Sequence, residues 1–474
     1  MSAASGTVAA VDLGATSGRV MLGHVGPDVL RLESVHRFPN GPTTTDDGLH
    51  WDATGLLSAV VTGLTEAARR DPGIRSVGID SWAVDYALLS DGRMLSEPFH
   101  YRDDRNDRGV ADVHSRVPFA ELYGQNGLQF LPFNTLYQLA ADRPRLHDAD
   151  SVLLIPDFLA NRLTGSRSAE VTNASTTGLL SRDGSWNDDL IARLGFPRNI
   201  FPPLVKPGTV LGTLLPAVAA ETGLSAQTPV TAVGSHDTAS AVVAVPMTTS
   251  QAAWISCGTW GLVGLELERP VLTEASREAN FTNEGGVDGR VRFLHNVMGL
   301  WLLSESVRTW ERESGETIDL PALLAQAAAV TAPMPVFDAD DPRFLQPGDM
   351  PGRIAEALTE HGQPAPRSKA EFVRTILESL ADAFARAVHT ASALANAPVD
   401  VIHVVGGGSL NTLLCQITAD RAGLPVLAGP VEATALGNVL VQARAVGLLT
   451  GDLESMRALV ARSFEPVRFE PLGR

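Results

Sequence analysis

The first segment of the chain with a clear hydrophobic pattern is two short apolar stretches joined by a polar turn. Residues 8–11 are apolar and lead to one acid, Asp12; the small residues 14–18 follow, and the chain is apolar again at 20–22. This pattern predicts two strands joined by a tight turn of small residues. Its N–H groups and hydroxyls suit a phosphate, and the Asp12 carboxylate suits magnesium. The alternative is an ordinary hairpin in which Asp12 only stabilises the turn.

A second copy of this pattern lies in the other half of the chain. Residues 252–266 again give an apolar strand, a turn of small residues at 256–259 and an apolar return. The two turns are roughly half a chain apart, which predicts two similar halves facing each other across a cleft. Two such hairpins directed at one polyphosphate form a specific arrangement, whereas a single glycine turn does not.

The remaining periodicity predicts alternating strands and helices, and so an α/β fold. In the first half we expect strands at 7–13, 19–25, 75–80 and 84–89 and helices at 53–70, 134–147 and 156–163. In the second half we expect a helix at 370–396 and a strand at 401–405, with 406–409 opening another helix. A short Pro/Thr/Ser stretch precedes the second hairpin, which predicts one domain at 1–245 and another at 246–474.

Composition narrows the class of protein. A chain of 474 residues with 44% hydrophobic and 19% charged residues fits a two-domain enzyme rather than a disordered protein. The net charge of -17 argues against nucleic acid and anionic membranes as partners. Cys257 and Cys415 lie in apolar segments and are expected to be buried thiols in a reducing compartment. No signal peptide or membrane span is evident, so we expect a cytoplasmic enzyme.

The scarcity of lysine limits the ways in which the chain could bind ATP. The only lysines are Lys206 and Lys369, and neither follows a phosphate turn. P-loop enzymes need a lysine directly after their glycine turn, and protein kinases need one on an early strand. Backbone amides, hydroxyls, a metal and Arg19 would therefore have to hold the phosphates.

Asp237 is the candidate general base. It lies in Ser235-His236-Asp237-Thr238, directly after an apolar strand and at the start of a helix rich in Ala and Val. A carboxylate near a helix N-terminus is held rigidly and stays ionised. The alternative is a helix cap, which is the commoner role of Asp and Thr at such a position.

Three further segments admit both a functional and a structural interpretation. The glycines 406–408 indicate either a strand–helix turn or the close approach of a nucleotide base or ribose. Trp82 is placed either to stack on a sugar or to fill the core. The charged run 101–105 is either a solvated cluster or the lining of a polar pocket. His236 is expected to be a hydrogen-bonding pocket residue, because the histidines lack the spacing of metal ligands.

Several segments together resemble the FGGY family of carbohydrate kinases. The segments that carry the resemblance are 9–19, 78–82, 126–138, 235–241, 283–286, 296–301, 405–414 and 428–438. The resemblance implies two ribonuclease-H-like domains of the actin–hexokinase type that flank a nucleotide and substrate cleft. The first would hold the sugar, the first phosphate hairpin and the catalytic Asp; the second would hold the second hairpin and the adenosine.

The resemblance also implies an activity and a set of site residues. The activity is phosphorylation of a small ketose, L-rhamnulose, at its 1-hydroxyl by ATP with Mg²⁺, in a monomer or a homodimer. Asp237 would be the proton acceptor, and Asp12 would bind magnesium through water. The implied ATP-binding residues are Ala15, Thr16, Ser17, Gly18, Arg19, Thr259, Ser304 and Gly407, and the implied sugar-binding residues are Ala83, His236, Asp237, Thr238 and Asn296.

Two of these positions depart from the family pattern, and they keep alternatives open. The family members that act on L-rhamnulose usually carry Gly where this chain has Ala83, and Gln where it has Ser304. A related ketose such as L-fuculose, xylulose or ribulose is therefore an alternative substrate. Filament-forming or chaperone-type ATPases share the fold but have no sugar hydroxyl to activate, and a sugar-binding regulator without catalysis would bind without turnover.

Overall fold

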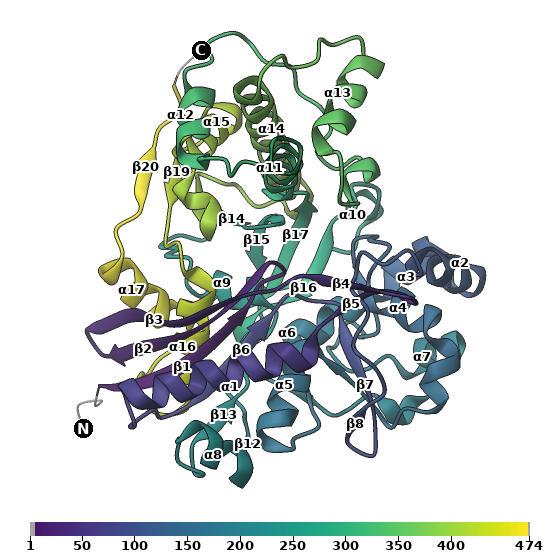
Figure 1. The fold of residues 1–474 in the computed structure, drawn as a ribbon, viewed down its shortest axis with the longest axis vertical. Helices are drawn as coiled ribbons and strands as arrows, with labels where there is room; N and C mark the ends of the chain where they lie inside the picture. Colours follow the sequence, from purple (N-terminus) through teal and green to yellow (C-terminus); the bar gives the residue numbers. More distant parts are fainter. Residues whose placement is uncertain (1–4, 473–474) are drawn as a thin grey trace. The chain divides into compact units, whose positions relative to one another are not determined.

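The computed structural model describes residues 5–472, which form two compact units. Unit 1 consists of Met1–Thr248, Glu266–Phe293 and Ala433–Phe464, and unit 2 consists of Thr249–Leu265, Leu294–Glu432 and Glu465–Arg474. The division at residue 245 stays a prediction; unit 1 contains residues 1–245 together with two later segments of the chain. The second of these segments contains the helices labelled α16 (Ala433–Ala445) and α17 (Leu453–Ser463) in Figure 1.

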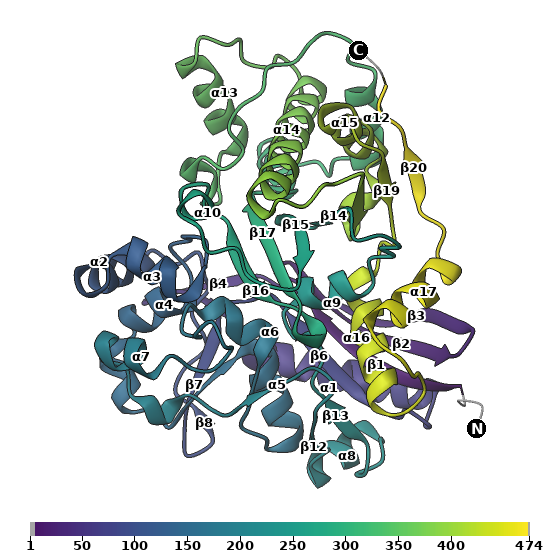
Figure 2. The ribbon, with the colours of Figure 1, turned by 180° about the vertical axis from the view of Figure 1, so that it is seen from behind.

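A six-stranded sheet forms the centre of unit 1, in the order β12-β13-β6-β1-β2-β3. Its strands are β1 (Gly6–Leu13), β2 (Ser17–Gly26), β3 (Val29–Pro39), β6 (Val77–Ser81), β12 (Val210–Thr213) and β13 (Pro229–Thr231). The strands β13, β6 and β1 run parallel, so their carboxyl ends lie at one edge. Helix α1 (Ala53–Arg70) covers one face (Figure 1), and α16 (Ala433–Ala445) covers the other (Figure 2).

The first hairpin has the form that the sequence predicts. β1 pairs with β2 in antiparallel register from Gly6 opposite Val25 to Leu13 opposite Gly18. Every residue of β1 after Gly6 is buried, because helices cover both faces of this strand. The sequence did not predict β3. Its side chains vary between buried and exposed without the apolar alternation that marks a half-buried strand.

The other elements of unit 1 surround this sheet. Short strands form small sheets in which β4 (Pro42–Thr45) pairs with β5 (Gly48–Trp51), β10 (Ala169–Glu170) pairs with β11 (Leu204–Val205), and β7 (Tyr86–Ser90) lies between β8 (Arg93–Met94) and β9 (Ser151–Leu154). The other α-helices are α2 (Asn106–Arg116), α3 (Phe119–Asn126), α4 (Thr135–Ala141), α5 (Ile155–Thr164), α6 (Val171–Ala174), α7 (Asp188–Leu194), α8 (Pro216–Thr222), α9 (Asp237–Val243), α10 (Glu274–Glu278) and α17 (Leu453–Ser463). The 3₁₀ turns are Arg143–His147, Ser175–Thr177, Arg198–Ile200 and Val287–Gly289.

Unit 2 is built on a seven-stranded sheet in the order β16-β17-β15-β14-β18-β19-β20. Its strands are β14 (Ala252–Cys257), β15 (Gly261–Leu267), β16 (Thr282–Gly285), β17 (Val291–Val297), β18 (Val401–Val405), β19 (Val426–Ala428) and β20 (Val467–Phe469). β16 and the start of β17 belong to the chain segment that is counted with unit 1. The antiparallel pair β14–β15 is the second predicted hairpin, and β18 runs parallel to β14.

Helices complete unit 2. They are α11 (Trp301–Ser314), α12 (Leu320–Ala328), α13 (Met350–Glu360), α14 (Lys369–Ala395) and α15 (Thr412–Ala422), with 3₁₀ turns at Pro342–Phe344 and Gly407–Leu410. The long helix α14 has an unbroken apolar face that includes Leu377, Leu380 and Phe384, all of which are buried. This periodicity is the reason that the sequence places the helix within one residue of its observed ends.

The predicted helix at 134–147 is wrong in its second half. It ends at Ala141 as α4, and the chain continues as the 3₁₀ turn Arg143–His147. Pro144 lies in the first turn of that segment. Proline has no N–H to donate and its ring clashes with the preceding turn of an α-helix, so α4 cannot continue through it.

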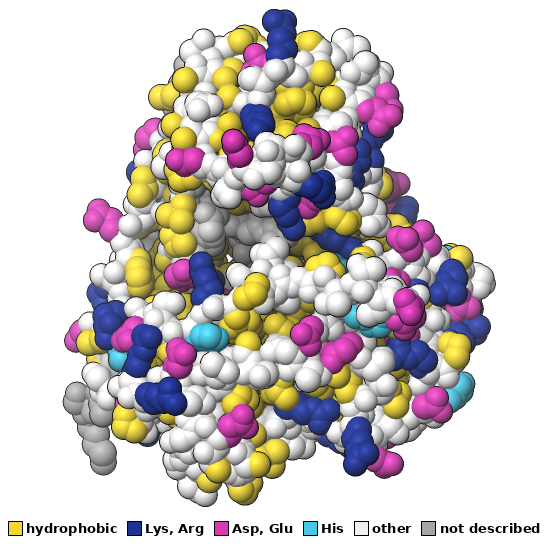
Figure 3. Space-filling model, in the orientation of Figure 1, with side chains coloured by type: hydrophobic (Ala, Val, Ile, Leu, Met, Phe, Trp, Pro, Cys, Tyr) yellow, Lys and Arg dark blue, Asp and Glu magenta, His cyan; other side chains and the backbone are white. Residues whose placement is uncertain are grey.

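Acidic and basic side chains are intermixed on the face of the molecule that Figure 3 shows. None of the helices formed by residues 5–472 is long and apolar enough to cross a membrane.

The close packing of α16 on α9 gives a first prediction. A Cβ at Gly437 would collide with the backbone oxygen of Ser240, whereas a Cβ at Gly124, in helix α3, would meet nothing within 4 Å. We expect Gly437→Ala to destabilise the fold by about 1–3 kcal/mol, because the two helices must move apart. We expect Gly124→Ala to be neutral or stabilising by about 1 kcal/mol. Urea unfolding of both variants tests this, and equal effects would contradict the packing.

Candidate active site

The candidate site of unit 1 is built at the carboxyl ends of three parallel strands. Asp12 at the end of β1 lies in register with Asp80 near the end of β6. The loop after β13 joins them, because the backbone N–H of Ser81 donates a 2.9 Å hydrogen bond to the carbonyl of Ser235. The carboxyl edge of a parallel sheet is where α/β proteins usually bind ligands. The strand order thus brings together two acids and the loop that carries Asp237.

Asp12 is held by Arg19 from the neighbouring strand. The two residues are opposite each other in the β1–β2 ladder, and Nε and Nη2 of Arg19 donate to Oδ2 of Asp12 at 2.9 and 2.7 Å. The Asp12 side chain is 6% exposed and that of Arg19 is 22% exposed. Because both donated hydrogens go to one oxygen, the guanidinium orients the carboxylate and leaves Oδ1 outside this contact.

Asp80 is fully buried beside Asp12. Its Oδ2 accepts a 2.5 Å hydrogen bond from the amide of Asn438 on α16, and Gln442 in turn donates to Asn438 and to the carbonyl of Ala9. Its Oδ1 has no hydrogen-bond partner among the described residues. Burial, followed by the negative charge of Asp12, raises the pKa of Asp80 well above its usual range. This shift favours the protonated form of Asp80.

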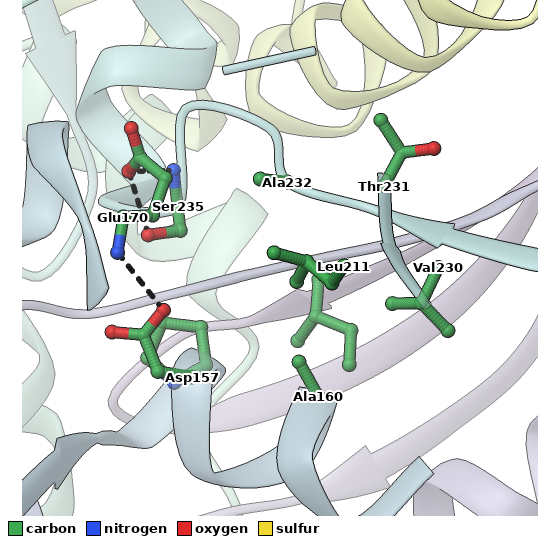
Figure 4. A pocket seen from close by; sticks show the side chains of 10 residues that line it. Asp157, Ala160, Glu170, Leu211, Val230, Thr231, Ala232 and Ser235 are labelled. Atoms are coloured by element: carbon green, nitrogen blue, oxygen red, sulfur yellow. Dashed lines mark hydrogen bonds between the residues drawn. The ribbon is translucent and has the colours of Figure 1, made fainter. Parts of the chain in front are cut away.

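Glu170 fixes the loop that carries the candidate base. Its Oε2 accepts hydrogen bonds from the backbone N–H of Ser235 at 2.9 Å and from the Ser235 hydroxyl at 2.8 Å, as Figure 4 shows. The backbone N–H and hydroxyl of Thr172 donate to the same carboxylate. Burial raises the pKa of Glu170, and these donors oppose that shift. A buried carboxylate with several donors forms a rigid anchor for the backbone of the loop.

A small cavity lies behind this anchor (Figure 4). Asp157 lines it together with Glu170, Thr231 and Ser235, and Oδ1 of Asp157 accepts a hydrogen bond from the backbone N–H of Glu170. Burial, together with the negative charge of Glu170, raises the pKa of Asp157 well above its usual range. The two adjacent carboxyls thus differ: the pKa of Asp157 is raised well above its usual range, whereas Glu170 accepts several hydrogen bonds that oppose its shift.

Asp237 is the first residue of α9, and its side chain is 30% exposed. Its Oδ1 accepts a 3.0 Å hydrogen bond from the hydroxyl of Thr238 and lies 3.5 Å from Nε2 of His236. Burial is the main cause that raises the pKa of Asp237, and His236 acts in the opposite direction. His236, not Asp237, occupies the N-cap position of the helix. Asp237 therefore does not cap the helix, and its role as a base stays a prediction.

His236 lies against a buried ion pair. Its Nδ1 is 3.1 Å from Nη2 of Arg292 and 3.3 Å from Oε2 of Glu284. Nη1 of Arg292 is 3.1 Å from the same oxygen of Glu284, and the Arg292 side chain has no exposed surface. Arg292 also donates from Nε to the carbonyl of Gly285 at 2.9 Å. The imidazole is therefore held from one side by two charged groups.

Ala83 lies in the turn after β6, next to Trp82, which packs in a buried aromatic cluster with Trp51. It is half-buried, and the next residue, Val84, has a φ of 69°. The carboxylate of Asp85 holds this turn by accepting hydrogen bonds from the indoles of Trp51 and Trp82 at 2.6 and 2.9 Å. Burial raises the pKa of Asp85 to about 6. Trp82 packs on Trp51 with ring centroids 4.1 Å apart, so of its two interpretations the structure supports the core role.

The first phosphate hairpin presents a small exposed turn. Thr16 is exposed and Ala15 and Ser17 are half-buried, while the Asn40 amide donates to the carbonyl of Gly14 at 2.8 Å and holds the turn. Gly18 is different. It is buried in β2, where a Cβ would collide with the ring of Phe38, so packing alone requires a glycine there.

Four of the predicted residues lie in unit 2, at its own strand ends and on α11. Thr259 is in the β14–β15 turn, and the backbone N–H of Trp301 donates to its carbonyl at 3.0 Å, which ties the turn to α11. Ser304 is exposed one turn into α11, and Asn296 is half-buried near the end of β17. Gly407 is exposed after β18, with open space where a Cβ would be.

The neighbours of Gly407 have a structural reason to be glycine. A Cβ at Gly408 would collide with the thiol of Cys257, and Gly406 has a φ of 82° with the Cys257 carbonyl 3.0 Å from its Cβ position. The sequence left open whether these three glycines form a strand–helix turn or approach a nucleotide. Packing against Cys257 explains Gly406 and Gly408, whereas Gly407 has open space where a Cβ would be.

Sequence reasoning missed the residues that support the site. Glu284 and Asn438 lie within segments that carried the family resemblance, but nothing in those segments indicated a role for either. Arg292 had a usable signal, since it is the one charged residue in the apolar start of β17. Glu170 had none, because Ser235, the loop residue that it holds, lies 65 residues away along the chain.

The comparisons with known proteins agree with this architecture. The models described as the N-terminal and C-terminal domains of the FGGY family of carbohydrate kinases match residues 7–244 and 253–446. A rhamnulokinase from Pectobacterium carotovorum subsp. carotovorum is 43% identical over 472 residues, 98% of this chain and 93% of that protein. A rhamnulokinase from Bacteroides thetaiotaomicron is 41% identical over 469 residues, 98% and 95% of the two chains.

A solved structure shows the same fold at low sequence identity. The crystal structure of gluconate kinase from Lactobacillus acidophilus has a TM-score of 0.77 with 17% identity, and the match covers 99% of this chain and 94% of that one. Identity at this level establishes the fold and says nothing of the substrate.

The second prediction concerns the raised pKa of the buried Asp80 carboxyl. A carboxyl whose folded pKa is raised contributes stability below its unfolded pKa of about 3.9, and this is lost as pH rises towards the folded pKa. Asp80→Asn removes that titration. We expect the free energy of unfolding of the variant, relative to that of the parent, to rise by about 1 kcal/mol or more when the pH is raised from 5 to 8. One pKa unit corresponds to about 1.4 kcal/mol. Urea unfolding at both pH values, with exposed Asp28→Asn as control, measures the gain. If the difference between variant and parent is the same at both pH values, Asp80 is already ionised at pH 5.

Proposed function

The chain belongs to the FGGY family of carbohydrate kinases, and on this premise we propose that it transfers the γ-phosphoryl group of ATP to the 1-hydroxyl of L-rhamnulose. The products are L-rhamnulose 1-phosphate and ADP. The observation that carries the proposal is the rigid placement of Asp237, held through Ser235 by Glu170 at the sheet edge that also carries Asp12. The rhamnulokinases that match the whole chain supply the substrate.

Asp237 is the proposed proton acceptor. The sugar O1 loses its proton to the Asp237 carboxylate while O1 forms a bond to the γ-phosphorus. The bond from the γ-phosphorus to the bridging oxygen breaks, and its electron pair stays with ADP. Because Oδ1 already accepts a hydrogen bond from Thr238, we propose that Oδ2 takes the proton. The raised pKa of Asp237 suits a base that must accept a proton and then release it.

The sugar-binding residues are proposed from the same loop and from two other positions. His236 and Thr238 flank the base, and Ala83 and Asn296 complete the set. His236 and Thr238 are well suited because each has a polar side chain that is held in place, His236 by Glu284 and Thr238 by its hydrogen bond to Asp237. A sugar hydroxyl needs such fixed donors and acceptors to bring O1 into line with the γ-phosphate.

ATP is proposed to bind to backbone amides and hydroxyls. The proposed contacts are Ala15, Thr16, Ser17, Gly18 and Arg19 in unit 1, and Thr259, Ser304 and Gly407 in unit 2. Exposed or half-buried small residues at strand ends allow phosphate oxygens to reach main-chain N–H groups. Gly18 could contribute only through its backbone, since it is buried against Phe38.

Magnesium is the proposed cofactor, and Asp12 is the residue proposed to hold it. Among residues 5–472 no group of three or more His, Cys, Asp or Glu side chains could hold a metal ion. Magnesium does not need a group of three protein ligands, because it usually binds through one or two carboxylates, water and substrate phosphates. Oδ1 of Asp12 lies outside the contact with Arg19 and suits this role, directly or through water. When bound, magnesium neutralises phosphate charge.

We propose that the two family domains divide these tasks. Residues 1–245 would hold the sugar, the first phosphate hairpin and Asp237, and residues 246–474 would hold the second hairpin and the adenosine. Asp237 and the first hairpin lie in unit 1, and Thr259 and Gly407 lie in unit 2. Either a monomer or a homodimer could carry out the reaction, because one chain contains every proposed residue.

We propose the cytoplasm as the location of the enzyme. Cys257 and Cys415 are both free and buried, and burial raises the pKa of each thiol to about 12. Cysteines that remain unpaired are typical of a reducing compartment.

The role of Asp237 gives the third prediction. We expect Asp237→Asn to lower kcat by about 10²–10⁴-fold, because the sugar hydroxyl loses its base, while the Kd for ATP stays unchanged. Asp188→Asn is the matched control, since Asp188 is also the first residue of a seven-residue helix but has a mostly exposed side chain. Steady-state kinetics and ATP titration of both variants measure this. Near-normal turnover of Asp237→Asn would remove Asp237 from the role of base.

Substrate choice gives the fourth prediction. ADP release with MgATP is compared for L-rhamnulose, L-fuculose, D-xylulose and L-ribulose by kcat/KM. We expect L-rhamnulose to have the highest kcat/KM. If another ketose does, the mechanism stands and Ala83→Gly is the first variant to test, because the family members that act on L-rhamnulose usually have glycine there. Sugar-independent ATP turnover, or sugar binding without turnover, would contradict the proposal.

A further inference from the structure

The neighbours of His236 constrain which of its ring nitrogens carries a hydrogen. Nη2 of Arg292 lies 3.1 Å from Nδ1 of His236. A guanidinium stays protonated in proteins and has no lone pair to accept a hydrogen bond. The contact is therefore a hydrogen bond only if Nδ1 carries no hydrogen and accepts one from Arg292. A neutral imidazole then carries its hydrogen on Nε2.

Glu284 offers a competing arrangement at the same nitrogen. Its Oε2 is 3.3 Å from Nδ1 and would accept a hydrogen if Nδ1 had one. That oxygen is already 3.1 Å from Nη1 of Arg292, whose positive charge is the main cause that lowers the pKa of Glu284 against the effect of burial. The carboxylate is thus ionised and paired. Since Arg292 is also nearer to Nδ1, the geometry favours donation from Arg292.

We propose that Arg292 is a positioning residue that keeps His236 as the tautomer with its hydrogen on Nε2. This inference rests on the proposed function for its catalytic meaning, since it concerns the same site. Nε2 is the nitrogen nearer to the base, at 3.5 Å from Oδ1 of Asp237. In this tautomer His236 presents a hydrogen-bond donor to the sugar and to the carboxylate, and it cannot accept the proton of the sugar hydroxyl. Asp237 is left as the base.

The opposite tautomer would place an Nε2 lone pair towards the Asp237 carboxylate. Two acceptors facing each other repel, and the imidazole would lose its donor to the sugar. Arg292 prevents this through its contact with Nδ1 of His236. The charged groups around the imidazole are Asp237 in its own loop, Glu284 on β16 and Arg292 on β17, and Arg292 also interacts electrostatically with Glu170 and Glu266.

Burial of the ion pair is better explained by positioning than by stability. Arg292 has no exposed surface and Glu284 is 7% exposed at the side chain. Replacing a buried ion pair by apolar residues of similar size often costs no stability, because the desolvation of two charges offsets their attraction. Apolar residues could not donate a hydrogen bond to Nδ1 of His236, whereas Arg292 can only donate. Arg292 is further fixed by its hydrogen bond to the carbonyl of Gly285, which directs Nη2 at the imidazole.

The direct test is the protonation state of the two ring nitrogens, measured by ¹⁵N NMR of histidine-labelled full-length protein, with His236→Asn to assign the signals. We expect Nε2 to carry the hydrogen in the parent and in Glu284→Gln, which keeps the Arg292 donor. In the charge-neutral pair Glu284→Gln/Arg292→Gln, an amide can donate or accept, so we expect the Nδ1–H form to become populated. A hydrogen on Nδ1 of the parent protein overturns the proposal.

A kinetic test separates positioning from a general loss of structure. Against Glu284→Gln, we expect the double variant to raise KM for L-rhamnulose about tenfold, which corresponds to one hydrogen bond, with KM for ATP unchanged. An equal rise in both KM values, or none, would contradict the proposal. If the double variant does not fold, as judged by circular dichroism, the spectra of the parent and of Glu284→Gln still decide the tautomer. Those spectra do not depend on the identity of the sugar, so failure of the proposed substrate is recognised separately.

Discussion

Desolvation of carboxyl groups is the constraint on which the structure of unit 1 depends. Asp80, Asp157, Glu170 and Glu284 are all buried near the carboxyl edge of one sheet, and each could be buried only by losing its charge or by gaining donors. The four groups show both outcomes. Asp80 and Asp157 have pKa values well above their usual range, whereas Glu170 accepts hydrogen bonds from Ser235 and Thr172, and Glu284 pairs with Arg292. The loop that carries Asp237 lies between these groups and is held in place by its contacts with Glu170 and Arg292.

This arrangement separates the residues that touch a ligand from those that hold them in place. Asp237 and its neighbour His236 come from a loop and a short helix that have little stability of their own. Glu170 fixes the backbone of the loop and Arg292 faces the imidazole, each from a different element of the fold. A side chain that must present one oxygen within hydrogen-bonding distance of a substrate gains more from such fixed supports than from added contacts. The supports are costly in desolvation, which explains why they are few and charged.

The parts that could be predicted from the sequence are those set by local patterns. The hairpin at Asp12, helix α1 at Ala53–Arg70 and strand β18 follow from periodicity, and the base candidate follows from a polar loop between a strand and a helix. The roles of Glu170, Arg292 and Asn438 could not be predicted, because each depends on a partner far along the chain. The packing reason for the glycines at 406 and 408 could not be predicted either. Their constraint is the side chain and carbonyl of Cys257, which no pattern of neighbouring residues reveals. Which proposed residues bind ATP and sugar stays a prediction.

The return of the last helices to unit 1 has a consequence for the order in which the chain can fold during synthesis. Asn438 and Gln442 on α16 supply the partners of Asp80 and of the Ala9 carbonyl, and α16 covers one face of the sheet that contains β1. The first strands therefore leave the ribosome more than 350 residues before the helix that completes their core. Until then that face of the sheet lacks both its apolar cover and the partner of Asp80. The core of the first unit is therefore completed only when almost the whole protein has been translated, and a chain that ends before Ala433 would lack one side of it.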